Sequence, residues 1–406
     1  MINYIKKLNT QITFNQIVIF IFTIIYCGFY YPNYQLFINI SYIILLIGVI
    51  KNLLHKKNNY KNEFWSLVCL FVIYSLLSSL WAMNYTASYN ASVQLIKSSF
   101  IAVLFSLLIT DKKNFITALI SLAIGGLIYS LIYIENVNVA DLSDTRIVTE
   151  EGSNSMLPNV NVVAMILSFS FLFFIHKLFV HKKKLYIIPT IISFIIIFIL
   201  GSRKSIISIF LGLLILFYQV NKKTKIKICF LLLALIAGLT LFIPDEYLNF
   251  VFDRLAQLNI FSNQKALLDS SDEMRIMLFE NGLNFISDKP FFGFGFYSFS
   301  ILFEQLYNIR VYSHNNFIET LVGGGIIGFI LYYGIYIIIM RNLVKYGQQN
   351  DYKLLLWIYI FILLFNHIGI VVLLDRFTWL LLSILYSGSK LLKNNYYENR
   401  ISCRQN

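Results

Sequence analysis

The chain has 406 residues, of which 58% are hydrophobic and 13% are charged, and its mean hydropathy is +0.70. Soluble domains carry about 25% charged residues, because their surface needs polar cover. This composition excludes a soluble enzyme and a disordered chain, and it leaves a polytopic membrane protein. The aromatic fraction of 17% suits a bilayer with tyrosine and tryptophan at its interfaces.

Twelve apolar segments are long enough to cross a bilayer as helices, which takes about 20 residues each. In chain order they are 13–30, 36–54, 64–83, 92–110, 115–134, 161–179, 185–200, 205–220, 228–243, 321–340, 354–371 and 377–392. The predicted fold class is therefore an all-α polytopic membrane protein with about 12 transmembrane helices.

The lysine and arginine residues are unevenly distributed between the two sets of loops that alternate along the chain. With the N-terminus in the cytoplasm, 23 of the 33 fall in inner segments and the other ten in outer segments. Because basic residues are retained on the cytoplasmic side, both termini are predicted to be cytoplasmic, including the tail at 393–406. The net charge of +13 is thus a topology signal, and no nucleic-acid partner is expected.

The spans divide the chain into parts. Residues 1–243 hold spans one to nine, 244–320 form one large outer loop, and 321–392 hold spans ten to twelve. A structureless loop of that length is uncommon, so it is expected to fold and to carry function. The predicted elements within it are an amphipathic helix lying on the outer membrane surface, a helix opened by a capping box, a turn and a third short helix. These elements cover 245–258, 270–286, 288–295 and 300–308 respectively.

Ten basic residues on the predicted outer side run against the general charge distribution, and each needs a reason. They are Lys97, Arg146, Arg203, Lys204, Arg254, Lys265, Arg275, Lys289, Arg310 and Arg376. The run Gly201-Ser202-Arg203-Lys204-Ser205 joins two apolar segments at the outer boundary, where a cation calls for an anionic partner. The guanidinium fork matches phosphate oxygens, whereas snorkelling toward lipid headgroups is the alternative. For Arg275, the alternative is a local ion pair with Asp272.

His314 is the candidate general base. It precedes a predicted helix start at which Asn316 and Glu319 form a capping pair. An imidazole with an ordinary pKa can accept a proton from a hydroxyl group, and it would lose that ability below about pH 6–7. A structural role is the alternative. The glycines at 323–325 and 328 are expected to permit close helix packing.

Several chemical signatures are missing from the sequence. The outer loops have no D-x-D pair, no His, Cys and acid cluster has metal-ligand spacing, and no phosphate-cradling glycine loop occurs. We therefore expect no metal and no cofactor.

In this order, these features resemble the O-antigen polymerase and O-antigen ligase superfamily of bacterial envelopes. The resemblance covers residues from about 161 to 340. It rests on Gly201-Ser202-Arg203, Arg275, the run Lys289-Pro290-Phe291-Phe292-Gly293-Phe294-Gly295, His314-Asn315, and Glu319 followed by Gly325-Ile326-Ile327-Gly328.

The resemblance implies a GT-C-like, metal-independent, inverting glycosyltransferase in the bacterial cytoplasmic membrane, with its active site on the outer face. The implied donor is an oligosaccharide on undecaprenyl diphosphate. Arg203 and Arg275 would bind the diphosphate and assist its departure, and His314 would act as the base. Lys204, Arg310 and Asn315 would help to bind the diphosphate or the glycan.

The acceptor distinguishes two versions of this function. A polymerase extends one lipid-linked repeat with another and can work with a chain-length regulator, whereas a ligase transfers the glycan to lipid A–core. The segments 201–205 and 313–319 look more like those of polymerases. A flippase or transporter is the alternative from another class, but the single large outer loop breaks the symmetry of inverted repeats. A non-catalytic envelope scaffold is the third.

Overall fold

The computed structural model describes residues 12–29, 34–55, 62–136, 159–242, 270–346 and 352–405, and all regular secondary structure in these ranges is helical. Twelve helices correspond to the twelve predicted spans. They are α2 (Phe14–Gly28), α3 (Gln35–His55), α4 (Glu63–Ser78) with the 3-10 turn η2 (Ser79–Trp81), α5 (Tyr85–Leu108), α6 (Lys112–Asn136), α8 (Val160–Phe179), α9 (Ile187–Leu200) after η4 (Lys184–Tyr186), α10 (Arg203–Gln219), α11 (Lys222–Phe242), α15 (Asn316–Tyr346), α16 (Lys353–Asn366) and α17 (Arg376–Gln405).

Within the described ranges, six helices are long and apolar enough to cross a membrane by length and composition: α3, α4 with η2, α5, α6, α8 and α15. Three further apolar helices are shorter: α2, α9 with η4, and α16. The all-helical fold class is confirmed for the described residues, and its apolar helices are those of a multi-pass membrane protein.

One predicted span extends beyond the end of the helix that the structure shows. The apolar segment 354–371 was expected to be a single span, but α16 ends at Asn366. The backbone N–H groups of Ile368 and Gly369 donate over short turns to Phe365 and Asn366 rather than continuing the helix. The chain then runs to α17 through residues 367–375, which we name the α16–α17 connector.

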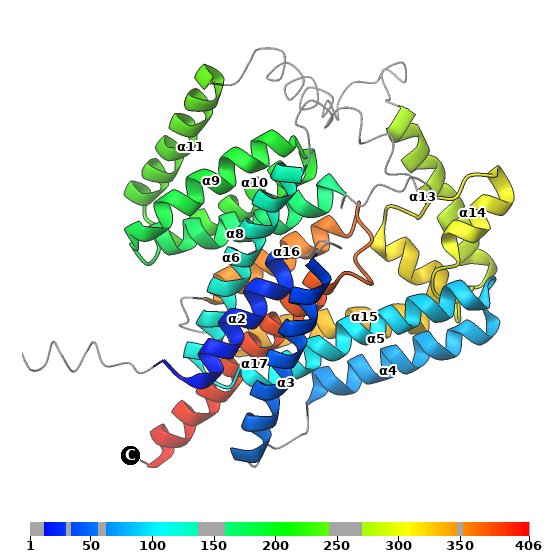
Figure 1. Ribbon diagram of the computed structural model, residues 1–406, viewed down its shortest axis with the longest axis horizontal. Helices are drawn as coiled ribbons and strands as arrows, with labels where there is room; N and C mark the ends of the chain where they lie inside the picture. Colours follow the sequence, from blue (N-terminus) through cyan, green and yellow to red (C-terminus); the bar gives the residue numbers. More distant parts are fainter. Residues whose placement is uncertain are drawn as a thin grey trace, which may run out of the picture.

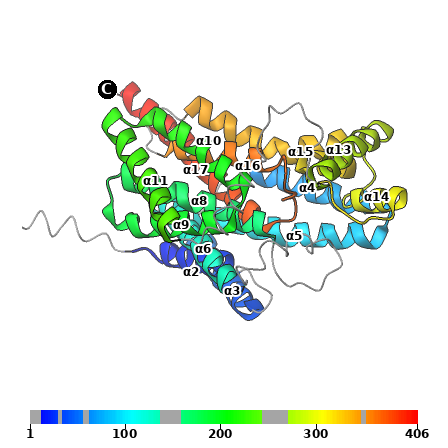
Figure 2. The same cartoon turned by 90° about the horizontal axis from the view of Figure 1, so that it is seen from above.

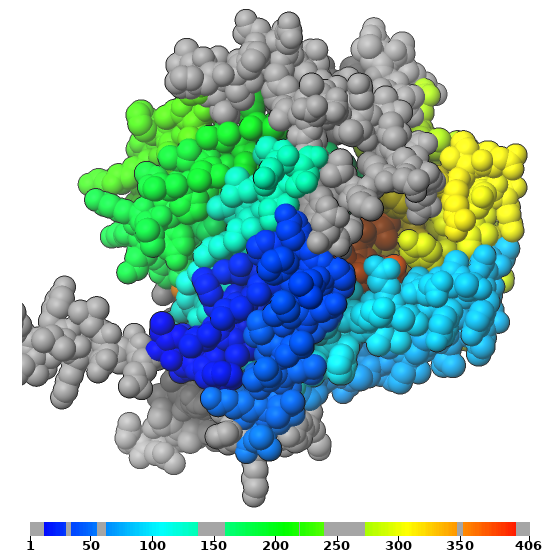
Figure 3. Space-filling model, in the orientation of Figure 1, coloured from blue at the N-terminus to red at the C-terminus, as the bar shows by residue number. Residues whose placement is uncertain are grey.

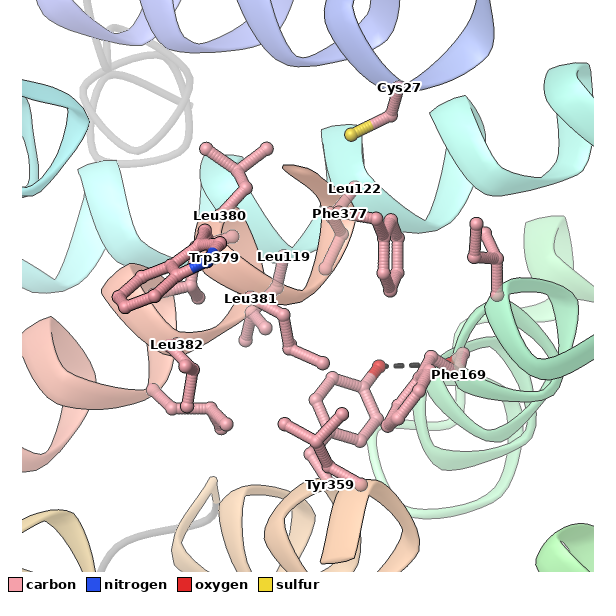
Figure 4. Close-up of a cluster of buried hydrophobic side chains, with 14 of the residues drawn as sticks. Cys27, Leu119, Leu122, Phe169, Tyr359, Phe377, Trp379, Leu380, Leu381 and Leu382 are labelled. Atoms are coloured by element: carbon pink, nitrogen blue, oxygen red, sulfur yellow. Dashed lines mark hydrogen bonds between the residues drawn. The ribbon is translucent and has the colours of Figure 1, made fainter. Parts of the chain in front are cut away.

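The main core is built around α8 and α17. Helix α8 is buried on nearly all sides, as expected for a helix that is apolar around its whole circumference. Figure 4 shows where aromatic and leucine side chains of these helices meet those of α6 and α16. There the Tyr359 hydroxyl donates to the backbone oxygen of Phe169 at 3.0 Å, and Phe377 and Trp379 are buried nearby. This core fixes the helices that carry the outer loop.

Two of the helices predicted within residues 244–320 are confirmed: α13 (Ser270–Asp288) and α14 (Phe299–Tyr307). They share a second, smaller apolar cluster with the start of α15, built on residues such as Leu278, Phe299 and Ile318. Figures 1 and 2 show them at the end of the molecule opposite the C-terminus, beside the ends of α4, α5 and α15. The predicted amphipathic helix at 245–258 lies outside the described residues.

Helix α15 is broken at Gly325, where φ is 60° and ψ is −165°. The turn after α13 closes the break: Ile326 N donates to Pro290 O and Phe294 N donates to Val322 O, both at 2.8 Å. Backbone groups freed inside an apolar helix need such partners, because no water is available to replace them. The predicted turn at 288–295 is therefore inserted at the break in α15, where its backbone supplies the missing hydrogen-bond partners.

The glycines where the 288–295 turn meets α15 allow close contact between the turn and the helix, more than contact between helices. A Cβ atom on Gly293, whose φ is 68°, would lie 2.6 Å from the backbone oxygens of Val322 and Gly323. A side chain on Gly325 would overlap the backbone of Phe291. The expectation of close packing is correct, but the closest partner is the 288–295 turn.

Candidate active site

The junction of α9 and α10 places Arg203 and Lys204 in the first turn of α10. Helix α9 ends at Gly201, whose left-handed backbone (φ 53°) reverses the chain, and Ser202 precedes α10. The Ser202 hydroxyl donates to the Asn161 side-chain oxygen of α8 at 3.0 Å, which anchors the junction to the core. Both basic side chains are half-buried. Arg203 has neither a hydrogen bond nor an ion pair with another described residue.

The α16–α17 connector is attached to α10 by two side chains. The Lys204 ammonium group donates to the backbone oxygen of Gly369 at 2.7 Å. The Asn366 amide, at the end of α16, donates to the Ser208 hydroxyl at 3.2 Å. The connector therefore lies directly beside the first turn of α10.

The same connector is attached to the start of α15. Asn316 N donates to the backbone oxygen of His367 at 2.8 Å, and Val372 N donates to the Asn316 side-chain oxygen at 2.9 Å. The Asn316 amide nitrogen also donates to the Tyr333 hydroxyl at 3.0 Å. Through the connector, α10 and the residues just before α15 are held in one framework, although they lie far apart in the sequence.

The predicted capping pair of Asn316 and Glu319 is wrong. Asn315 is the capping residue: its side-chain oxygen accepts from Phe317 N at 2.9 Å and from Ile318 N at 3.3 Å. Asn316 is instead buried between the connector and Tyr333. The Glu319 carboxylate accepts from Ser313 N at 3.1 Å, which lies before the helix start. The helix begins at Asn316, one residue earlier than a cap at 316 would need.

His314 occupies an unusual backbone position just before α15. Its φ is 51°, in the left-handed region that favours glycine, and its ring lies 4.1 Å from the Tyr312 ring, centroid to centroid. Such strain is concentrated at functional sites, where the surrounding structure enforces it. Burial and the positive charges of Arg275 and Lys204 lower the pKa of His314 to about 4. The imidazole is therefore neutral at physiological pH and able to accept a proton.

The structure thus brings two of the predicted cations, Arg275 and Lys204, close to the His314 imidazole. Arg275, half-buried on α13, and Lys204 on α10 are both close enough for their charges to act on His314. Arg203 lies beside Lys204 at the start of α10.

The other two predicted site residues have different surroundings. Arg310 is exposed, and its Nε lies 3.9 Å from the Glu304 carboxylate of α14. The Asn315 side-chain oxygen is already used to cap α15.

The sequence did not predict the polar contacts of the connector. His367 is buried, and its ring nitrogens contact two hydroxyl groups, Tyr333 at 3.1 Å and Tyr336 at 3.2 Å. The available signal was the run Asn366-His367-Ile368-Gly369 inside an apolar segment, because polar residues at such positions are costly unless they have partners or a function.

No group of three or more His, Cys, Asp or Glu residues that could hold a metal ion occurs within the described part of the chain. The charges that lower the pKa of His314 are instead those of two cations, Arg275 and Lys204. A set of guanidinium and ammonium groups suits a ligand that carries several negative oxygens.

Comparison with known proteins agrees with this chemistry. Residues 188–333 match the sequence model of a family described as O-Antigen ligase. The matched segment includes the first turn of α10, α13, the 288–295 turn and His314. It supports the resemblance of this segment to the O-antigen polymerase and ligase superfamily. No curated protein matches the chain.

Proposed function

We propose that this protein transfers a glycan from undecaprenyl diphosphate to a hydroxyl group of an acceptor sugar. The observation that carries the proposal is the convergence of Arg275 and Lys204 on a neutral His314, all within the segment that matches the O-Antigen ligase family. A proton acceptor beside a group of cations is what transfer from a diphosphate requires.

In this proposal, Arg203 and Arg275 bind the diphosphate of the donor. As the bond between the anomeric carbon and the phosphate oxygen breaks, negative charge grows on the leaving diphosphate. Fixed guanidinium groups in a site with little water stabilise that charge without reorganising, and their fork contacts two oxygens at once. This accounts for a metal-independent reaction, because the arginines supply the charge for which other transferases use a metal.

His314 acts as the general base. It takes the proton from the acceptor hydroxyl while the oxygen forms its bond to the anomeric carbon and the lipid diphosphate departs with the electron pair. Attack from the side opposite the diphosphate inverts the anomeric centre. A neutral imidazole is the required form, which agrees with the lowered pKa of His314.

We further propose a location and an orientation: a bacterial cytoplasmic membrane with twelve spans, both termini in the cytoplasm and the site on the outer face. The distribution of lysine and arginine residues supports this orientation. The placement of α13 and α14 at the end of the molecule away from the C-terminus agrees with it (Figures 1 and 2). The surface of the α16–α17 connector is visible beside the outer loop in Figure 3. A donor would therefore reach the site from the outer side.

The acceptor decides between two reactions. We propose that the protein polymerises lipid-linked repeat units of an O-antigen or capsule, as the segments 201–205 and 313–319 suggest. Transfer of the finished glycan to lipid A–core is the second candidate, supported by the description of the matched family as an O-Antigen ligase.

The glycan ladder of a deletion strain tests both candidates. Loss of long chains with retention of core plus one repeat is expected for a polymerase, whereas loss of every repeat from the core indicates a ligase. An unchanged ladder would refute both. With purified protein and a lipid-linked donor, chelation of divalent metals should leave activity intact, and full inhibition that is reversed by added metal would contradict the role given to the arginines.

A further inference from the structure

Glu319 is a buried carboxylate that the proposed reaction does not use. Its residue is 6% exposed, and it lies in the first turn of α15, where the helix dipole favours a negative charge. One carboxylate oxygen accepts from Ser313 N at 3.1 Å, which is the amide next to His314. Glu319 of α15 is thus hydrogen-bonded to the turn that contains His314, the candidate base.

The turn around His314 is held from both sides. Before it, the Ser313 hydroxyl donates to the backbone oxygen of Asn315 at 2.9 Å and accepts from Asn315 N at 3.3 Å. After it, Asn315 caps α15. The contact from Glu319 joins the beginning of this turn to the helix itself, so it ties the left-handed conformation of His314 to the position of α15.

The surroundings of Glu319 keep its carboxylate in place. It lines a small cavity of about 20 Å³ together with Phe296, Tyr297, Val371 and Leu373. A space of this size holds about one water molecule. The Glu319 carboxylate therefore cannot turn to another rotamer there and be fully hydrated. A hydrogen bond to a charged acceptor in apolar surroundings is among the stronger ones in proteins.

We propose that Glu319 is a positioning residue: its carboxylate, acting as a hydrogen-bond acceptor for Ser313 N, holds the His314 imidazole in place at the active site. This inference rests on the proposed role of His314 as base. Glu319 does not touch the substrate and does not take part in proton transfer. What matters is an acceptor oxygen at that point, and its charge is secondary.

The experiment compares Glu319→Gln, Glu319→Ala and His314→Ala in the full-length protein in detergent, with Glu280→Ala on the exposed face of α13 as the control. The first measurement is amide hydrogen exchange of the peptide that covers Ser313 to Asn315. The second is the turnover number and the KM for lipid-linked donor.

Glu319→Ala should expose the Ser313 amide and speed its exchange about 10- to 100-fold, since a charged hydrogen bond is lost. Turnover should fall by a similar factor with little change in the donor KM. Glu319→Gln keeps an acceptor oxygen, so both exchange and turnover should stay within about threefold of the unmodified protein. In the His314→Ala background, the further substitution Glu319→Ala should cost little, because two residues that act as a unit are not additive.

Unchanged exchange in Glu319→Ala would overturn the inference, whatever the activity. So would an inactive Glu319→Gln variant with protected amides, because that result requires a charge or a proton on Glu319. Full activity of His314→Ala would instead refute the proposed base, and the exchange measurement would still decide whether Glu319 holds the turn.

Discussion

The ammonium group of Lys204 donates to the backbone oxygen of Gly369 at 2.7 Å, across a sequence separation of 165 residues. A Cβ atom on residue 369 would overlap Nζ of this lysine, so the approach depends on glycine. This contact explains the position of Lys204 at the predicted outer boundary by a structural role, in addition to the two earlier explanations, lipid snorkelling and phosphate binding. It also binds the first turn of α10, and with it Arg203, to the framework that holds the start of α15.

Gly369→Ala should displace Lys204 and lower turnover about tenfold, since a charged hydrogen bond that orients the site is lost. The measurement is donor turnover with purified protein at matched expression. Gly238→Ala on α11 is the matched control, because the added methyl group would have no described atom within 4 Å apart from its own stretch of helix. Equal activity of both variants would show that the contact does not position the site.

Arg203→Ala should reduce turnover by about 10²–10³-fold, the usual cost of removing a donor to a developing negative charge. Arg203→Lys keeps the charge but loses the fork, so most of that loss should remain. Arg341→Ala provides a comparison, because this exposed arginine pairs with Glu63 at 2.7 Å on the predicted cytoplasmic side. Wild-type activity of Arg203→Ala and of the equivalent Arg275→Ala would remove the diphosphate-binding role.

The pH dependence of kcat/KM should report His314. With a pKa of about 4, the imidazole stays neutral as the pH falls through 6 and becomes protonated only near pH 4. Activity should therefore persist well below pH 6–7, the limit expected for an ordinary histidine. Lys204→Met removes one of the charges that lower this pKa, so the acid limb should move to higher pH.

His314→Gln tests the base itself. The side chain can still form a hydrogen bond, but it cannot accept the proton, so turnover should fall about 10²–10⁴-fold and the acid limb should disappear. Substantial activity with an unchanged acid limb would mean that His314 only orients the acceptor.

Gly325→Ala should destabilise the protein by at least about 2 kcal/mol, because alanine disfavours the positive φ and its methyl group would overlap the inserted turn. The thermal unfolding midpoint in detergent measures this effect. Gly238→Ala should be neutral or slightly stabilising, since alanine has the higher helix propensity. A stable Gly325→Ala variant would contradict the insertion of the 288–295 turn into α15.

Reporter fusions check the proposed topology. Fusions after Lys57, Lys183 and Gln348 should report the cytoplasm, and fusions after Asn154 and Gln264 should report the outer side. A cytoplasmic signal at Gln264 would place the outer loop, and the site with it, on the wrong side of the membrane.

Local patterns in the sequence were enough to predict much of this protein. Apolar length marks the positions of the helices predicted as spans, because a helix in lipid must satisfy its own backbone, and the capping box at 270–273 marks the start of α13. The order of Arg203, Arg275 and His314 pointed to the superfamily that the match at 188–333 supports.

Tertiary structure decided the rest, because burial and contacts between distant segments have no local pattern. Asn315, not Asn316, caps α15, since Asn316 is used by the connector. The need for glycine at 293 and 325 becomes clear only from the contact between the 288–295 turn and the broken helix α15. The pKa of His314 is lowered by burial and by charges from α13 and α10, which come near it only after the chain has folded.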